Sequence, residues 1–400
     1  MTLILFILFS TTSCCLIDCR RYRERGGELP VPSLVCNIKT SVISSGKLLK
    51  LVHVRKHEVC RPSTERDKCC RVMAVSEYQG MIVISQPSAN PLFPGFGARR
   101  FNMLDQKLGN FVGLGKEVIR DFSFHPVTPE LLLSCGQEKV VRVTNMVSCS
   151  EVVRFTVDTE VWACDWAMGG QHSHLYLGTK RSQILVHDTL QPTAEPLVIS
   201  FPGSERRPII SLVSVPSSPA SGLSHPGLLV LTLGSLWYFE HNLATNTLTP
   251  HKLPTPAGRM FWSLEYEAST RLILLVCRPG PLATHLVMEL VTTEIPHTGK
   301  VVTVNTIMTV EGGSYKDRSF LRSCLMVTDK KEGRVMMAYT RGTGLGDIKV
   351  VVQEVPTGRI VQELGVGKPV LDVKVAAINN QQYLAVLGET DLNMYRVEQS

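Results

Sequence analysis

The 400-residue sequence contains no Cys-x-x-Cys pair, no Asn-x-Ser/Thr site and no Gly-x-Ser-x-Gly elbow. A structural zinc finger or zinc ribbon needs paired Cys-x-x-Cys elements, because two thiolates at that spacing take two corners of one tetrahedron. The missing elbow removes the usual nucleophile of a serine hydrolase. We therefore expect no catalytic, cofactor-binding or metal-binding residues in this sequence.

Two glycine-rich segments come close to nucleotide-binding motifs without matching them. Gly109–Lys116 has five residues between its outer glycines, where a phosphate-binding loop has four, and Glu117 stands where that loop needs Ser or Thr. Gly342–Asp347 lacks the Gly-x-Gly-x-x-Gly spacing of a dinucleotide-binding turn. We interpret both segments as turns between strands.

The formal net charge of +7 is concentrated near the N-terminus. Residues 1–70 hold 12 of the 42 Lys and Arg residues but only 6 of the 35 Asp and Glu residues, so residues 71–400 are nearly neutral. A dedicated nucleic-acid-binding domain carries a basic patch or stripe. We therefore expect no direct nucleic-acid binding by residues 71–400.

Residues 1–46 form a candidate leader with a short apolar run, Leu3–Phe9. The run is too short for a membrane-spanning helix, which needs about 20 apolar residues, so we expect no membrane association. Positive charge follows the run, at Arg20 and beyond, whereas it precedes the run in a secretory signal. A signal peptide or anchor, a poorly ordered leader and a non-native start joined upstream of the domain stay open. The abrupt change in composition near Arg71 favours the third.

Seven of the twelve cysteines lie within the first 70 residues, where His57, Cys60, Cys69 and Cys70 form only loose fragments of a metal site. We expect unligated thiols there. The later cysteines show no spacing of a disulfide framework, which, with the missing glycosylation sites, favours a reducing compartment inside the cell. Three of them lie inside apolar runs and are predicted to be small buried apolar residues: Cys135, Cys164 and Cys277.

From Arg71 onward, short runs of alternating apolar residues are separated by turn residues, which is the pattern of β-strands. Two consecutive groups of four runs, within 118–155 and 161–201, align element by element, with an offset of 42 residues between Phe124 and Trp166. A period of about 40–45 residues with four strands per unit is typical of a WD-type propeller blade. The usual Trp-Asp dipeptide is degenerate, so the four-strand grouping carries the prediction.

Five further units bring the total to seven, starting near Arg71, Ile209, Met260, Phe320 and Val370. We predict an all-β fold, a seven-bladed WD-type β-propeller over residues 47–400, with a poorly ordered leader over residues 1–46. Another all-β arrangement, such as a pair of sandwiches, is the alternative.

The seventh unit supplies only three strands, and an open ring would expose a sheet edge. Lys47–Val54 is the only good strand pattern before the first unit, so we predict that residues 47–54 complete the seventh blade. Asp121, Asp165 and Asp372 recur in the first strands of their units, where we expect them to bond neighbouring turns rather than to catalyse a reaction.

Ile84–Ser88 (Ile-Ser-Gln-Pro-Ser) and Pro94–Gly97 (Pro-Gly-Phe-Gly) are the most distinctive motifs of the chain. They resemble the C-terminal WD-repeat region of the RING finger and WD repeat domain-containing protein three family of RING-type E3 ubiquitin ligases. The likeness runs from about Arg71 to the C-terminus. It continues in order at 116–120, 161–164, 184–188 and 369–372.

The resemblance implies a substrate-recognition module of a ligase that acts in the nucleus, in the DNA damage response, at replication forks and in interstrand crosslink repair. The implied protein clients are replication protein A and recombination factors. In that family a zinc-binding RING recruits the ubiquitin-conjugating enzyme, and this sequence has no RING ligands, so enzyme activity stays open. A RING-less decoy or scaffold that holds the client, and a secreted or anchored propeller, are the alternatives; the cytoplasm is the second expected compartment.

Propellers bind partners with loops that a rigid ring holds in place. Residues just before the first strand of each blade usually line one rim, and here they are mostly basic, which suits an acidic protein segment. Ordinary solvated charges are the alternative interpretation. The candidate partner-binding rim consists of Lys116, Glu117, Glu160, Arg206, Arg207, Arg259 and Lys368.

Overall fold

The computed structural model describes residues 49–61, 69–170, 172–203, 206–219, 222–242, 245, 247–278, 282–295, 299–313, 322–329, 333–342 and 346–399. All of these residues belong to one compact unit. The predictions made for residues 1–46 lie outside the described residues.

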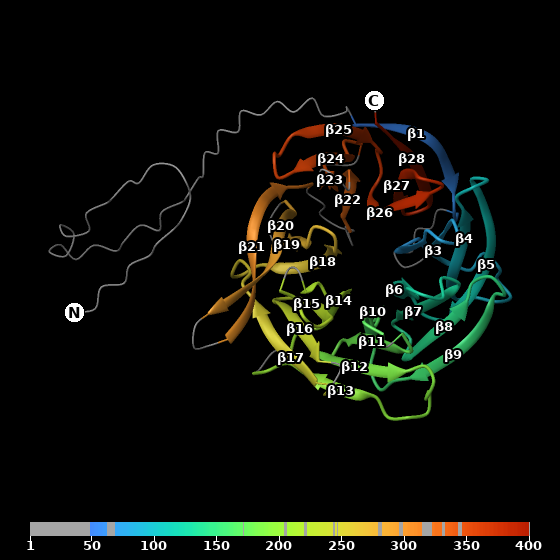
Figure 1. Ribbon diagram of the computed structural model, residues 1–400. Coiled ribbons are helices and arrows are strands. Elements are labelled where there is room, and N and C mark those ends of the chain that lie inside the picture. The colour runs from blue at the N-terminus through green and yellow to red at the C-terminus, as the bar shows by residue number, and fades with distance from the viewer. Residues whose placement is uncertain are drawn as a thin grey trace, which may run out of the picture. The chain divides into compact units, whose positions relative to one another are not determined.

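Seven four-stranded antiparallel sheets surround a central axis, and this confirms the predicted seven-bladed β-propeller (Figure 1). Within the first six blades the strands follow one another from the axis outward. Among the described residues there is no α-helix, and no helix is long and apolar enough to cross a membrane.

The strands of the first three blades are β2 (Met73–Ser76), β3 (Met81–Pro87), β4 (Phe96–Asn102) and β5 (Lys107–Gly115); β6 (Ile119–Phe124), β7 (Leu131–Gly136), β8 (Val140–Asn145) and β9 (Ser150–Thr156); and β10 (Val161–Trp166), β11 (His174–Thr179), β12 (Gln183–Asp188) and β13 (Leu197–Ser200). Those of the next three are β14 (Ile209–Val215), β15 (Gly227–Thr232), β16 (Leu236–Asn242) and β17 (Thr247–Leu253); β18 (Met260–Glu267), β19 (Leu272–Arg278), β20 (Thr284–Ile295) and β21 (Gly299–Glu311); and β22 (Cys324–Asp329), β23 (Arg334–Arg341), β24 (Lys349–Val355) and β25 (Ile360–Gly365).

The seventh blade closes the ring with a strand from the other end of the chain. Its order is β26 (Val370–Ile378), β27 (Gln381–Gly388), β28 (Asp391–Gln399) and β1 (Leu49–Glu58). The antiparallel pairing of β1 with β28 runs from Leu49 opposite Gln399 to Glu58 opposite Asp391. The predicted pairing is therefore confirmed over the described residues 49–54, and the strand continues four residues beyond Val54.

The core lies between the blades, because each sheet packs its two faces against its neighbours. Inner strands are therefore buried on both sides: every residue of β15 is buried, whereas β9 at the outside alternates and is mostly exposed. Cys135, Cys164 and Cys277 are at most 3% exposed, which confirms them as small buried residues.

Three carboxylates, two of them buried, tie the inner strand of one blade to the next. Asp121 Oδ2 accepts a hydrogen bond from the Cys164 amide at 3.2 Å, and Asp165 Oδ2 accepts one from the Ser214 amide at 2.7 Å. Asp372 Oδ2 accepts one from the Met73 amide at 2.9 Å, across the junction of the last and first blades. The predicted structural role of the three residues is confirmed, but they bond amides in the first strand of the next blade rather than a neighbouring turn.

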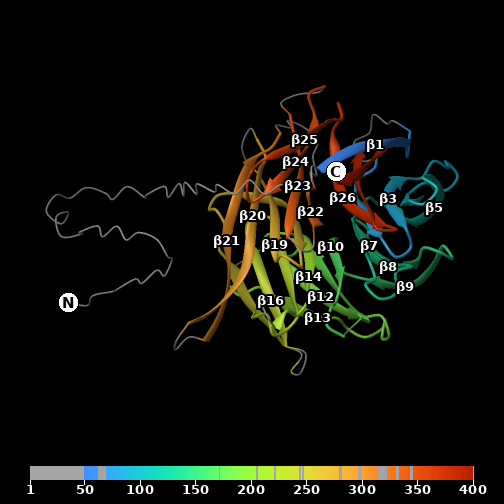
Figure 2. The same ribbon diagram turned by 45° about the horizontal axis from the view of Figure 1, so that its top comes forward.

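The up-and-down course of the strands gives the propeller two distinct faces. One face, here called the connection face, carries the links between blades and the turns between second and third strands. The opposite turn face carries the turns between first and second and between third and fourth strands. The long β20–β21 hairpin extends beyond its neighbours (Figure 2).

Candidate protein-binding face

In five blades the innermost strand carries a β-bulge directly after its first or second residue. Each ladder shifts register across one residue, for example between Ile119 and Asp121 or between Val161 and Ala163. A bulge re-aims the extra side chain out of the regular alternation. The residues at the five shifts are Arg120, Trp162, Ile210, Trp262 and Leu371.

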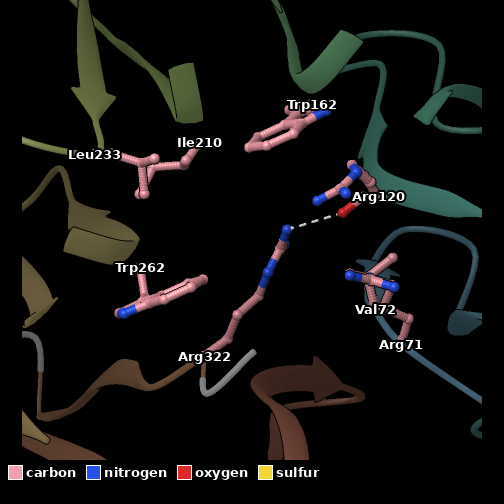
Figure 3. Close-up of a pocket in the computed structure, with 8 residues that line it drawn as sticks. All are labelled: Arg71, Val72, Arg120, Trp162, Ile210, Leu233, Trp262 and Arg322. Carbon is pink, nitrogen blue, oxygen red and sulfur yellow. Dashed lines mark hydrogen bonds between the residues drawn. The ribbon is translucent and has the colours of Figure 1, made fainter. Parts of the chain in front are cut away.

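Four of these five side chains line a pocket of about 260 Å³ at the centre of the ring (Figure 3). Its other lining residues are Arg71, Val72, Leu233 and Arg322. Arg71 and Arg322 each stand two residues before the first strand of their blade, and Leu233 lies in the β15–β16 turn. All of these positions are at the connection face, so the pocket opens there.

The pocket has an apolar side and a cationic side. Trp262, Leu233 and Ile210 lie on one side, while Arg71 and Arg120 lie opposite them (Figure 3). Arg322 reaches between the two sides, and its guanidinium group donates a hydrogen bond to the Arg120 carbonyl oxygen at 3.2 Å. A ligand group seated here therefore meets aromatic and aliphatic surface on one flank and guanidinium groups on the other.

Neighbouring groups hold the side chains of the cationic side in place. The Arg120 guanidinium carbon lies 4.1 Å from the centroid of the Trp162 ring, which is a cation–π contact. The Trp162 indole nitrogen donates a hydrogen bond to Glu160 Oε2 at 2.9 Å. Arg322 Nη1 lies 2.9 Å from Asp121 Oδ1 in an ion pair.

The charges around the pocket are set by these pairings. Hydrogen bonds from Lys180 and then from Trp162 hold the pKa of Glu160 below its usual range. Burial alone would lower the pKa of Arg322, but the carboxylates of Asp121 and Asp372 outweigh it and raise that pKa, so the guanidinium group stays charged. None of the eight lining residues is acidic, and three of them are arginines.

None of the seven predicted rim residues lines this pocket. Five of them are exposed, namely Lys116, Glu117, Arg206, Arg207 and Lys368, and Glu160 and Arg259 are half-buried. Two adjoin the pocket: Glu160 bonds Trp162, and Arg207 packs over Gly234, next to Leu233. Lys368 lies farther out, with its Nζ 3.6 Å from Asp391. Partner binding by this set stays a prediction.

The prediction missed the pocket residues because it stopped at the links before the first strands. A usable signal was present, since Arg120, Trp162 and Trp262 stand at the same place in the first strands of the second, third and fifth units. That recurrence predicts a pocket only when the bulge is known, because the bulge turns these side chains toward the axis.

The β3–β4 turn presents two apolar side chains on the connection face. Leu92 is 81% exposed and Phe93 is 73% exposed. Hydrogen bonds within the turn order it: the Leu92 amide donates to Asn90 Oδ1 at 3.0 Å, and the Ser88 amide donates to the Gly95 carbonyl at 2.8 Å. Exposed apolar groups on an ordered loop are suited to protein contacts.

The glycines of the Pro-Gly-Phe-Gly motif allow this turn to pack against the next strand. Gly95 has φ of +142°, and a Cβ there would overlap the Gly115 carbonyl oxygen. A Cβ at Gly97 would overlap the Val112 carbonyl oxygen of β5. Only glycine fits such close backbone approaches, so the motif has a structural cause.

Comparison with protein families identifies the domain. A family model described as "E3 ubiquitin-protein ligase RFWD3 WD40 domain" matches residues 62–396. The chain belongs to the RFWD3 WD40 family. The propeller is thus a protein-interaction module related to that of RFWD3.

Curated relatives named E3 ubiquitin-protein ligase RFWD3 agree with this assignment. Those of Ailuropoda melanoleuca and Mus musculus are each 26% identical, and that of Homo sapiens is 24% identical, each over 82% of this chain. The matched region spans only 42% of each RFWD3 relative. Activities that belong to the whole of RFWD3 are therefore not shown by these matches.

A solved propeller shares the fold of this RFWD3-family domain. The β-propeller domain of Myceliophteria thermophila Cps50 (Swd1) matches with a TM-score of 0.60 over 86% of this chain and all of that domain. The two sequences are 12% identical, so this likeness concerns the fold alone.

Proposed function

We propose that the propeller is the substrate-recognition module of a RING-type E3 ubiquitin ligase, and that it holds the client protein on its connection face. The observation that carries the proposal is the RFWD3 WD40 family match over residues 62–396, together with an ordered connection face whose central pocket is lined by three arginines. We further propose nuclear action in replication-fork and crosslink repair, with replication protein A and recombination factors as clients.

Ubiquitin transfer in this proposal comes from a zinc-binding RING outside these 400 residues, which contain no Cys-x-x-Cys pair. The propeller supplies binding and orientation of the client. Since its loops sit on seven rigid blades, the client is held without a large loss of loop entropy.

The test is binding of the purified chain to purified replication protein A by biolayer interferometry. We expect saturable binding that weakens as salt is raised, because exposed charges steer the encounter. Arg207→Glu and Arg259→Glu should each slow association, while Lys107→Glu on the turn face should not. Absence of binding to the unmodified chain would refute the client assignment, and equal association rates for all three variants would refute the role of the rim.

A cell experiment separates the ligase module from a decoy. If the chain is fused to a RING, client ubiquitination should rise; the chain alone at high concentration should lower it by occupying the client. A fusion that leaves ubiquitination unchanged while binding persists favours the decoy function.

A further inference from the structure

We propose that the central pocket receives one bulky apolar side chain from an acidic segment of the client, and that a neighbouring carboxylate of that segment pairs with the arginines of the pocket. This inference rests on the proposed function, since it assigns the chemistry that the connection face recognises. It identifies the anchor point of the complex.

The size of the pocket suits a single side chain. Its volume of about 260 Å³ lies below the range of roughly 300–1,000 Å³ that holds a small-molecule ligand. Trp262, Leu233 and Ile210 offer the apolar wall on which an aromatic or long aliphatic group packs (Figure 3). Aromatic anchors in such pockets dominate the energetics of many interfaces.

The charge of the pocket determines which residue of the client lies next to the apolar side chain. Arg71, Arg120 and Arg322 line it, and none of its eight described lining residues is acidic. Arg322 pairs with Asp121, and Arg71 and Arg120 lie on the wall of the pocket opposite Trp262 (Figure 3). The planar guanidinium fork matches a carboxylate with two parallel hydrogen bonds.

The cationic wall is held in place before a ligand binds. The Arg120 guanidinium group stacks on Trp162, and Glu160 fixes the indole of Trp162. A guanidinium group that is already held loses less side-chain entropy when it binds a carboxylate. Arg120, Trp162 and Glu160 therefore act as one unit, with Glu160 as a positioning residue outside the pocket.

Nucleic acid fits this surface less well than an acidic peptide. Single strands are bound by continuous positive grooves with a row of stacking side chains. Around this pocket, carboxylates alternate with the cations: Glu117 follows Lys116, and Glu160 lies between Trp162 and Lys180. A phosphate backbone carries a charge at every nucleotide and would meet these carboxylates along its path, whereas one carboxylate beside the anchor needs only the guanidinium groups of the pocket.

The test uses fluorescein-labelled nine-residue peptides with one central Phe and four Asp or Glu residues on each side. We expect saturable binding to the full chain by fluorescence polarisation. Replacing Phe by Ala in the peptide, or replacing its acidic residues by Lys, should each weaken binding by about 30-fold, the effect of losing one interface anchor.

Variants of the chain locate the site. Trp262→Ala, and Arg71→Gln combined with Arg120→Gln, should each reproduce that loss. Tyr78→Ala is the matched control, because Tyr78 is 86% exposed on the turn face. Thermal unfolding checks that each variant folds, and Trp162→Phe serves as a milder variant that keeps the ring stack but loses the bond to Glu160.

The outcomes separate this inference from the proposed function. If replication protein A binds the unmodified chain and the pocket variants equally well, the pocket inference fails while the function stands. If replication protein A does not bind but the acidic peptide binds in the pocket, the client assignment fails and the inference stands. Preferred binding of an oligo-dT strand at the same residues overturns the acidic-peptide assignment.

Discussion

Closure of the ring by β1 can be tested by truncating one buried side chain of that strand. Leu51 is 2% exposed and belongs to the apolar cluster that also contains Leu364 and Val350 of the sixth blade. Leu51→Ala removes three methyl or methylene-sized groups from a packed site. Substitutions of this kind cost about 2–5 kcal/mol, and we expect about 3 kcal/mol here.

The backbone of the same residue is anchored to the neighbouring blade. The Leu51 amide donates to Gln362 Oε1 at 2.7 Å, and Gln362 Nε2 donates to the Leu51 carbonyl at 2.9 Å. These two bonds keep β1 in register while the cavity forms, so the surroundings of Leu51 cannot easily collapse into it. We therefore expect the measured loss of unfolding free energy to include the full cost of the cavity.

The assay is thermal unfolding followed by circular dichroism. An unfolding entropy of about 2.1 cal/mol/K per residue over roughly 350 residues converts 3 kcal/mol into a fall in Tm of about 4 °C. Val54→Ala is the control, because Val54 lies on the same strand at a bulge and is 41% exposed. Equal melting temperatures for Leu51→Ala and Val54→Ala would refute the closing role of β1.

Two further substitutions test the loop motif and one buried histidine. Gly97→Ala places a Cβ against the Val112 carbonyl oxygen and should destabilise the chain by about 1–3 kcal/mol in urea unfolding; a loss below 0.5 kcal/mol would contradict the close approach. His285 is fully buried with no hydrogen-bond partner for either ring nitrogen among the described residues, and burial lowers its pKa to about 3. The unfolded chain takes up a proton at this residue below pH 6.5, so stability falls as pH drops from 6.5 towards 3, by about 2 kcal/mol at pH 5. His285→Leu should reduce that fall between pH 7 and pH 5, and an unchanged pH dependence would contradict it.

The repeat of the fold was readable from the sequence because inner strands, buried on both faces, form apolar runs that recur. β7 and β11 illustrate this: Leu131–Gly136 and His174–Thr179 occupy equivalent places in successive blades. The closing strand was also predictable, since a three-stranded last unit demands a fourth strand from elsewhere.

The binding pocket was not predictable to the same degree. Arg120 and Trp162 stand in runs whose alternation assigns them to a sheet face, and only a bulge turns them towards the axis. Bulges depend on the register between strands, which no single run of residues specifies. The length of the β20–β21 hairpin escaped prediction for a similar reason, because its outer part pairs only with itself.

Hydrogen–deuterium exchange of the chain with and without bound replication protein A tests most directly that the connection face binds the client. We predict slower exchange in segments 88–95, 115–118 and 233–235 on the connection face, and unchanged exchange in the turns at 77–80 and 103–106 on the opposite face. Protection confined to 77–80 and 103–106 would contradict the account.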